Sequence, residues 1–339
     1  MNHQDQTANL TEDTQSLRRV LRTYRTPNRW RSAVEIMITV IPLVALYAAM
    51  LVTLNAGYPA GLLLALPAGG LVVRLFMIQH DCSHYAFFRS RRANNWLGRI
   101  IGVVTLTPHD LWRHTHRVHH ANSGNLDRPP TGGIITLTVT EYEALNRWQR
   151  LRYRLYRHPL VLFGLGPIYF FFLHNRLPIG FMRAGWMPWL STMGTNAAIA
   201  VIVGGVIWLT GGVTFLLAYL AIMLVASVIG VWLFYVQHQF EHTSWEKEDV
   251  WSFDQAALQG SSHYDLPPIL RWFTANIGIH HIHHLCSGIP FYRLSTVLRD
   301  YPELHDISRV TLGQSLATVR LALWDENRNR LVPFGQHNL

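Results

Sequence analysis

The chain contains few cysteines and few charged residues. Cys82 and Cys286 are the only cysteines among 339 residues, so a disulfide framework is excluded and we expect two free thiols. A structural zinc site closed by several thiolates is excluded for the same reason. Charged residues amount to 14% of the chain, whereas 49% of its residues are hydrophobic. This balance favours an integral membrane protein over a soluble domain.

The apolar residues are concentrated in long blocks. A helix that spans the hydrocarbon core of a bilayer needs about 20 largely apolar residues. Because every backbone polar group in lipid must bond within the protein, such blocks form helices. We therefore predict an all-α integral membrane fold with four transmembrane helices in two hairpins. The predicted spans are residues 34–54, 60–78, 189–209 and 213–236.

Two shorter apolar stretches, at 96–106 and 160–173, are too short to span a bilayer. Their length fits interfacial or re-entrant segments and ordinary core helices equally well. The first residues of the chain are polar, and the first apolar block is long enough to remain a span. We therefore expect no cleavable signal peptide.

Basic residues surround only some of the connections. Six arginines between positions 18 and 31 precede the first span, and four between 89 and 99 follow the second. The connections at 55–59 and 210–212 contain neither Lys nor Arg. The positive-inside rule then places both termini and the long middle region in the cytoplasm.

The net charge of +9 raises the question of nucleic acid as a partner. The basic residues flank the spans, however, and no nucleic-acid motif accompanies them. We expect anionic lipid headgroups to be their partners and predict no binding of nucleic acid. Nothing in the sequence indicates an oligomeric state.

Histidines gather into four short clusters. Residues three and four apart on a helix share a face, so each cluster is able to direct several imidazoles to one point. Imidazole suits Zn, Cu, Fe and Ni, whereas Mg and Ca prefer oxygen ligands. The number of well-spaced histidines favours two metal ions. The clusters are H-D-C-S-H at 80–84, H-R-V-H-H at 116–120, H-Q-F-E-H at 238–242 and H-H-I-H-H at 280–284.

All four clusters are predicted on one side of the membrane. His80 follows the second span directly and His238 follows the fourth, so membrane helices anchor two of the clusters. The orientation assigned from the arginines places the other two on the same cytoplasmic side. We therefore expect a cytoplasmic helical cap that holds one histidine-rich site for two metals.

Three longer runs carry a resemblance to a known family. They are similar to the integral membrane fatty acid desaturase superfamily, in particular to its bacterial acyl-lipid desaturase branch. The similarity extends from about residue 31 to residue 299. The runs are W-R-H-T-H-R-V-H-H-A-N-S-G-N-L-D-R at 112–128, F-Y-V-Q-H-Q-F-E-H-T at 234–243 and N-I-G-I-H-H-I-H-H-L-C-S-G-I-P-F-Y-R-L at 276–294.

The resemblance implies a di-iron centre that uses O2 and two electrons to introduce a C=C bond into a fatty acyl chain of a membrane lipid. It also implies a ninth ligand just after the last span, at His238 or at His242. Their spacing of four lets either or both point inward. His281 lies at a position that the family leaves open, which suggests a structural role. The eight other implied iron ligands are His80, His84, His116, His119, His120, His280, His283 and His284.

Further residues are candidates through their position near the clusters. Metal-bound imidazoles usually donate their second N–H to an oxygen, and Asp81, Glu241 and Asp127 are the candidates for this role. Asn276 would lie one helical turn before His280, where it would hold a metal-bound water. Capping or surface charge is an equally good explanation for each. Aromatic residues that would wall an acyl tunnel, or belong to a membrane-interface belt, are Trp112, Trp232 and Tyr235.

The resemblance also divides the chain. A basic cytoplasmic segment at 1–32 is expected to precede a membrane desaturase domain at 33–299, and a cytoplasmic tail at 300–339 to follow it. The chain lacks the H-P-G-G signature of a fused cytochrome b5 domain, so a separate electron donor of ferredoxin, flavodoxin or cytochrome b5 type is implied. The chain departs from the family after Arg128, where 129–133 read P-P-T-G-G in place of a basic and an acidic residue.

Two other functions fit the clusters. A hydroxylase acting on a lipid, an alkane or a carotenoid would begin with the same hydrogen abstraction. A membrane metal transporter or sensor would also use histidines, although transport predicts polar ligands along a path within the spans. The clusters instead follow the ends of the spans, which favours the enzyme.

Overall fold

The computed structural model describes residues 16–128 and 133–335, and most of these residues are helical. Short strands make the predicted all-α class wrong in detail. The helices and strands are η1 Arg22–Arg25, α2 Arg29–Asn55, η2 Pro59–Leu64, α3 Ala65–Ser83, α4 Arg91–Val104, α5 His109–Asn122, β1 Leu137–Thr138, α6 Val139–Ala144, α7 Arg147–Arg157, η3 Leu160–Leu165, α8 Gly166–Ile168, η4 Tyr169–Leu173, η5 His174–Arg176, α9 Trp186–Thr210, α10 Val213–His238, α11 Phe253–Gln259, β2 His263–Asp265, α12 Pro268–Phe273, α13 His280–Leu285, α14 Phe291–Asp300, η6 Pro302–Leu304, β3 Arg309–Thr311, α15 Leu312–Thr318, β4 Leu323–Asp325 and β5 Arg330–Val332.

Within the described residues, four helices are long and apolar enough to cross a membrane, as predicted. They are Arg29–Asn55, Pro59–Ser83, Trp186–Leu209 and Val213–His238. Three of them continue into polar residues beyond the apolar block, at the start of α2 and at the ends of α3 and α10. Asn28 caps the first of them by accepting hydrogen bonds from the backbone N–H groups of Trp30 and Arg31.

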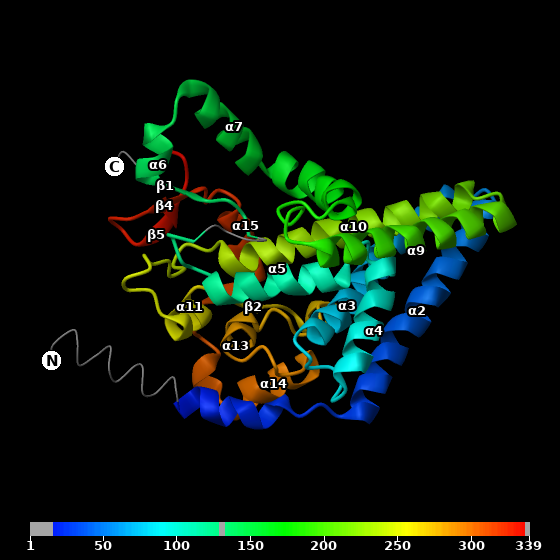
Figure 1. The fold of residues 1–339 in the computed structure, drawn as a ribbon, viewed down its shortest axis with the longest axis horizontal. Helices are drawn as coiled ribbons and strands as arrows, with labels where there is room; N and C mark the ends of the chain where they lie inside the picture. The colour runs from blue at the N-terminus through cyan, green and yellow to red at the C-terminus, as the bar shows by residue number, and fades with distance from the viewer. Residues whose placement is uncertain (1–15, 129–132, 336–339) are drawn as a thin grey trace.

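The span formed by η2 and α3 lies inside the molecule. Its most apolar stretch is 67% buried, compared with 11% in α2 and 6% in α9, and α3 contacts α2, α4 and α10 (Figure 1). The exposed side chains of α2 and α9 are largely apolar, among them Ile41, Val44 and Val201. Such a surface suits lipid.

A buried ion pair joins the first two spans. Glu35 of α2 and Arg74 of α3 are both shielded from solvent, and the Arg74 guanidinium donates to the Glu35 carboxylate. The same guanidinium donates to the carbonyl oxygen of Trp272 in α12. A buried charge is tolerated when it is paired and hydrogen-bonded, so this contact attaches the last third of the chain to the spans.

Gln79 fixes the turn between α4 and α5. Its Nε2 donates to the Thr107 carbonyl at 3.2 Å, and its Oε1 accepts from the Thr105 hydroxyl at 2.7 Å. Gly102 permits the turn to fold back on α4, because a Cβ atom there would lie 2.4 Å from the Thr107 oxygen. The turn therefore sets where α5 begins relative to α3, and α3 carries His80.

The strands form two small sheets. Strand β4 lies between β1, in parallel, and β5, antiparallel, while β2 and β3 pair in parallel. Each described strand has two or three residues, which is too short for an alternating pattern to be visible in the sequence. The region after Pro290 therefore contains three of these strands as well as helices.

The two short apolar stretches are both helical. Residues 96–104 belong to α4, and residues 160–173 form the π-helical segments η3 and η4 around α8. Residues 16–25, in the basic N-terminal segment, are helical too. Most of the departure from the family at 129–133 lies outside the described residues.

Candidate metal centre

Four segments bring nine histidines together. α5 supplies His116, His119 and His120, α13 supplies His280, His283 and His284, and the end of α3 supplies His80 and His84. His238 is the last residue of α10. Eight of the nine are buried, and His84 is half-buried. The nine are the eight histidines that the resemblance implied, together with His238.

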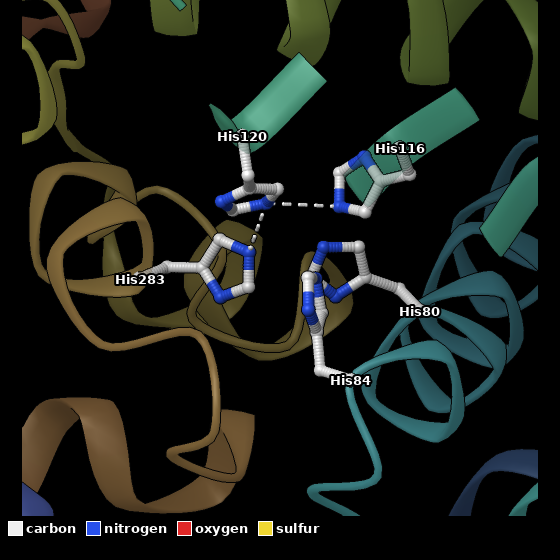
Figure 2. Close-up of side chains that lie close together, drawn as sticks. All are labelled: His80, His84, His116, His120 and His283. Carbon is white, nitrogen blue, oxygen red and sulfur yellow. Dashed lines mark hydrogen bonds between the residues drawn. The ribbon is translucent and has the colours of Figure 1, made fainter. Parts of the chain in front are cut away.

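The histidines form two adjacent groups. The five-histidine group contains His80, His84, His116, His120 and His283, and Figure 2 shows their rings directed toward one another. The four-histidine group contains His119, His238, His280 and His284. Within each group, one ligand nitrogen from every residue lies within 4.8 Å of the others.

Helical spacing explains how both α5 and α13 serve both groups. On α5 the i, i+4 pair His116 and His120 joins the five-histidine group, while His119 joins the other. On α13 the i, i+4 pair His280 and His284 joins the four-histidine group, while His283 crosses over. The rings of His120 and His284 stack at 4.0 Å between centroids, so the groups touch.

The distances between nitrogens fit metal ligation. His120 Nε2 lies 3.0 Å from His116 Nε2 and 3.1 Å from His283 Nε2, and His238 Nε2 lies 3.1 Å from the Nε2 atoms of His119 and His280. A bond of about 2.1 Å to a metal places two nitrogens at right angles about 3.0 Å apart. In a hydrogen-bonded pair of neutral imidazoles, one N–H group satisfies one lone pair. A metal ion between the rings satisfies the lone pairs of several imidazoles at once.

Second nitrogens support the same interpretation. His238 Nδ1 lies 3.2 Å from the Gly260 carbonyl, and the hydrogen bond it donates there directs the Nε2 lone pair into the four-histidine group. The Nε2 atoms of His84 and His284 are buried without a hydrogen-bond partner. Unpartnered buried acceptors that converge on one point fit a cation.

Burial keeps the imidazoles neutral. It lowers the pKa of His84 to about 3, and it lowers the pKa values of His120 and His283 well below the ordinary value. The neighbouring histidines lower the pKa values of His120 and His283 further, because a second positive charge nearby opposes protonation. Neutral rings with free lone pairs are the form that binds a transition metal.

His242 is not brought into either group. It is exposed, four residues beyond His238. The expectation that a spacing of four lets both point inward assumes a continuous helix, but α10 ends at His238 and Gln239 leaves the helical conformation. His281 also lies outside the groups, and its Nε2 lies 2.9 Å from the Leu304 carbonyl.

The four candidate partners of the ligands lie in different places. Asp81 is buried 3.5 Å from His80 Nδ1 and accepts the Phe291 N–H at 2.7 Å, so it joins α3 to the start of α14. Glu241 is exposed and pairs with Arg330. Asp127 is exposed and accepts the backbone N–H of Glu248. Neither of these two exposed carboxylates has a contact with the nine histidines.

Asn276 does not precede His280 on a helix. Helix α13 begins only at His280, and Asn276 has a positive φ of 58° in the turn before it. Its Nδ2 donates to the Phe291 carbonyl at 3.2 Å. The residue therefore stabilises the turn that leads into α13, in a conformation that Asn tolerates better than most residues.

A third group of possible ligands consists of His263, Asp265 and His305. Arg271 holds one carboxylate oxygen of Asp265 at 2.9 Å, and Arg309 holds the other at 2.7 Å. Two guanidinium groups already compensate this carboxylate and would repel a cation. We therefore assign no metal to this group.

Comparison with known proteins identifies the family. Residues 55–313 match the family model described as fatty acid desaturase. The chain belongs to the fatty acid desaturase family. It is accordingly a membrane fatty acid desaturase, an oxidoreductase, as the histidine clusters and apolar helices predicted.

Three relatives illustrate the range of similarity. The desaturase is 41% identical over 310 residues to a protein of Bacillus subtilis (strain 168) named fatty acid desaturase, covering 91% of this chain and 87% of that protein. It is 30% identical to an sn-1 acyl-lipid omega-3 desaturase (ferredoxin) of Synechocystis, covering 67% and 63%. It is 25% identical to an sn-1 oleoyl-lipid 12-desaturase of Picosynechococcus, covering 79% and 78%.

Aromatic side chains contact the histidines of this desaturase on two sides. Trp112 stacks on His116 with ring centroids 4.4 Å apart. Phe234, which sequence reasoning missed, lies 5.2 Å from His119 and 5.3 Å from His238 between ring centroids. The sequence signal for Phe234 was its position four residues before His238 in the fourth apolar span, because residues four apart on a helix share a face.

Two other aromatic candidates point elsewhere. Trp232 donates to the Tyr264 hydroxyl at 3.3 Å, and the Tyr235 hydroxyl donates to the Thr318 carbonyl at 2.7 Å. Both side chains therefore attach α10 to the C-terminal third of the desaturase. Neither contacts the nine histidines.

A pocket of about 120 Å³ opens beside the four-histidine group. His119 and His238 line it together with the apolar side chains of Phe234, Ile134 and Trp245. Two of the four histidines therefore border a cavity.

Proposed function

We propose that the chain holds two iron ions on the nine histidines and desaturates an acyl chain of a membrane lipid with O2. The observation that carries the proposal is the contact between two imidazole groups of five and four rings. The five-histidine group would hold one ion and the four-histidine group the other. Imidazole suits iron, and the family and the names of its acyl-lipid relatives support the same choice.

A redox metal is needed because the substrate carries no acidic proton. An unactivated methylene offers nothing to a general base, so its desaturation needs redox chemistry, which iron held by the histidines would supply with O2. In the balanced reaction, –CH2–CH2– with O2, two electrons and two protons becomes –CH=CH– with two waters. Zinc undergoes no redox change and does not support this reaction.

The residues around the histidines would position the substrate and exclude water. Trp112 and Phe234 present aromatic faces beside the two groups and leave apolar surface for an acyl chain. Tight packing holds the ligands in place, since His80, His116 and His283 are all buried against other rings. Enclosure of this kind limits side reactions of the oxidant.

The orientation and the electron donor complete the proposal. The arginines before α2 and after α3 support cytoplasmic termini, a cytoplasmic site and four spans in two hairpins of a bacterial inner membrane. Two relatives carry ferredoxin in their names, which supports a ferredoxin-type donor for this chain. The polar ligands lie at the ends of the spans, which argues against a transport path.

Expression in a host with simple saturated lipids tests the proposal. We expect new monoenes or dienes among the fatty acid methyl esters and two irons per purified chain. His119→Ala should abolish the product and remove roughly half of the iron, because it takes one ligand from a four-ligand set. His242→Ala is the matched control and should retain product and iron. A hydroxylated product, or one labile zinc per chain, would overturn the proposal.

A further inference from the structure

A second pocket, of about 300 Å³, lies between the N-terminal segment, α5 and residues 284–288. Four arginines line it: Arg18, Arg22 and Arg25 from the N-terminal segment and Arg117 from α5. Arg18 pairs with Asp254 at 2.9 Å. The other three have no carboxylate partner within residues 16–128 and 133–335, so the pocket presents uncompensated positive charge.

The pocket reaches both histidine groups. Its inner wall includes His120 of the five-histidine group and His284 of the four-histidine group, whose rings stack at 4.0 Å. Gly288 forms part of the rim, and the Arg25 guanidinium lies against it, since a Cβ atom there would be 2.3 Å from Arg25 Nε. A partner seated on the arginines would therefore approach both groups through one layer of imidazole.

The place of the pocket in the fold favours a soluble partner. Its walls come from residues 16–25, α11 and α13, which lie at the end of the molecule remote from the turn between α9 and α10 (Figure 1). If the spans cross the bilayer, this end projects into the aqueous phase. A lipid headgroup would instead be held beside the spans.

We infer that Arg18, Arg22, Arg25 and Arg117 form the docking surface for an acidic electron-carrier protein, which delivers electrons at His120 and His284. The inference rests on the proposed function, because desaturation consumes two electrons that the chain does not store. Electrostatic complementarity of this kind raises the association rate and makes it sensitive to salt. The pocket beside His119 and Phe234 then remains available for other small molecules.

A charge reversal with a matched control tests the docking surface. Arg22→Glu changes an exposed arginine of the pocket, and Arg19→Glu makes the same change on an exposed arginine of the same segment that does not line it. With the full iron-loaded chain and an acidic [2Fe–2S] ferredoxin, Arg22→Glu should raise the KM for reduced ferredoxin about tenfold and flatten its salt dependence. Arg19→Glu should change the KM by less than about threefold.

A chemical reductant separates docking from chemistry. Anaerobic reduction with dithionite and a viologen mediator, followed by removal of the excess reductant and addition of O2, gives a single turnover that bypasses the carrier. We expect Arg22→Glu to keep its product yield and its iron content under these conditions. Equal ferredoxin KM values for both variants would overturn the inference, as would an equal loss with ferredoxin and with dithionite. If Arg22→Glu weakened binding to phosphatidylglycerol vesicles and left ferredoxin binding unchanged, the surface would be assigned to lipid. That result would also overturn the inference. Absence of unsaturated product from the unmodified chain with dithionite would refute the proposed function, whereas ferredoxin binding would still report on docking.

Discussion

At the scale of single residues, the neutral state of the histidines decides how the protein responds to acid. The folded pKa of His84 is about 3, whereas an unfolded histidine titrates near 6.5. Between these values the unfolded chain binds more protons than the folded chain. The stability that His84 contributes is therefore complete above about pH 6.5 and is lost as the pH falls toward 3.

We predict that the iron-free protein melts at the same temperature at pH 8 and pH 7, and at progressively lower temperatures below about pH 6.5. Each such buried histidine contributes a slope of up to about 1.4 kcal/mol per pH unit in this window. Melting in detergent after chelation measures the effect. His242→Ala, which alters an exposed ring, should leave the profile unchanged, and a melting temperature that rises on acidification would contradict the prediction.

The sequence predicted eight of the nine gathered histidines and left His238 and His242 as alternatives for the ninth, but it did not predict the division of the nine into two groups. Spacing shows which rings share a helix face, as for His116 and His120, but which neighbouring helix they meet depends on tertiary packing. The two site predictions that failed have a local cause. Both His242 and Asn276 were placed by assuming helical continuity, and the helix ends at His238 in one case and begins at His280 in the other.

At the scale of elements, the close approach of α4 to the following turn positions α5 against α3. We predict that Gly102→Ala lowers the melting temperature and the iron content, because its Cβ would meet a backbone oxygen 2.4 Å away that has no freedom to rotate. Overpacking of this type costs roughly 1–3 kcal/mol.

Gly194→Ala provides the control for this substitution. Gly194 lies on α9, where an added Cβ atom would have no neighbour within 4 Å, and alanine is the better helix former there. Its melting temperature should stay the same or rise. Equal effects of the two substitutions, measured by thermal unfolding and by iron analysis, would show that the close contact of Gly102 does not position α5.

Predictability also differs between elements for physical reasons. The four long helices are evident because lipid demands continuous apolar runs, and their positions agree with the sequence to within about a turn or two. The strands were missed because pairs such as β2 with β3 are only three residues long and join segments far apart in the chain. Such pairing is set by the packed helices around it.

At the scale of the whole molecule, the spans and the metal site depend on each other. The end of α3 supplies His80 and His84 and the end of α10 supplies His238, so three of the candidate ligands are placed by membrane helices and six by α5 and α13. The Glu35–Arg74 pair and the Asp81–Phe291 bond attach the last third of the chain to the same spans. Insertion of the spans and assembly of the site are therefore expected to be coupled.

The orientation of the whole molecule gives the final prediction. Tyr58, in the turn between the first two spans, is exposed, as is Arg91 at the start of α4, and the charge rule places them on opposite sides of the membrane. In a Cys286→Ser background, a membrane-impermeant maleimide should label Tyr58→Cys in intact spheroplasts and Arg91→Cys only in inverted vesicles. Cys82 is buried, so its reaction with the maleimide should add little background labelling. The reverse labelling pattern would place the histidine groups outside the cytoplasm, where a soluble cytoplasmic electron carrier has no access to the arginine pocket.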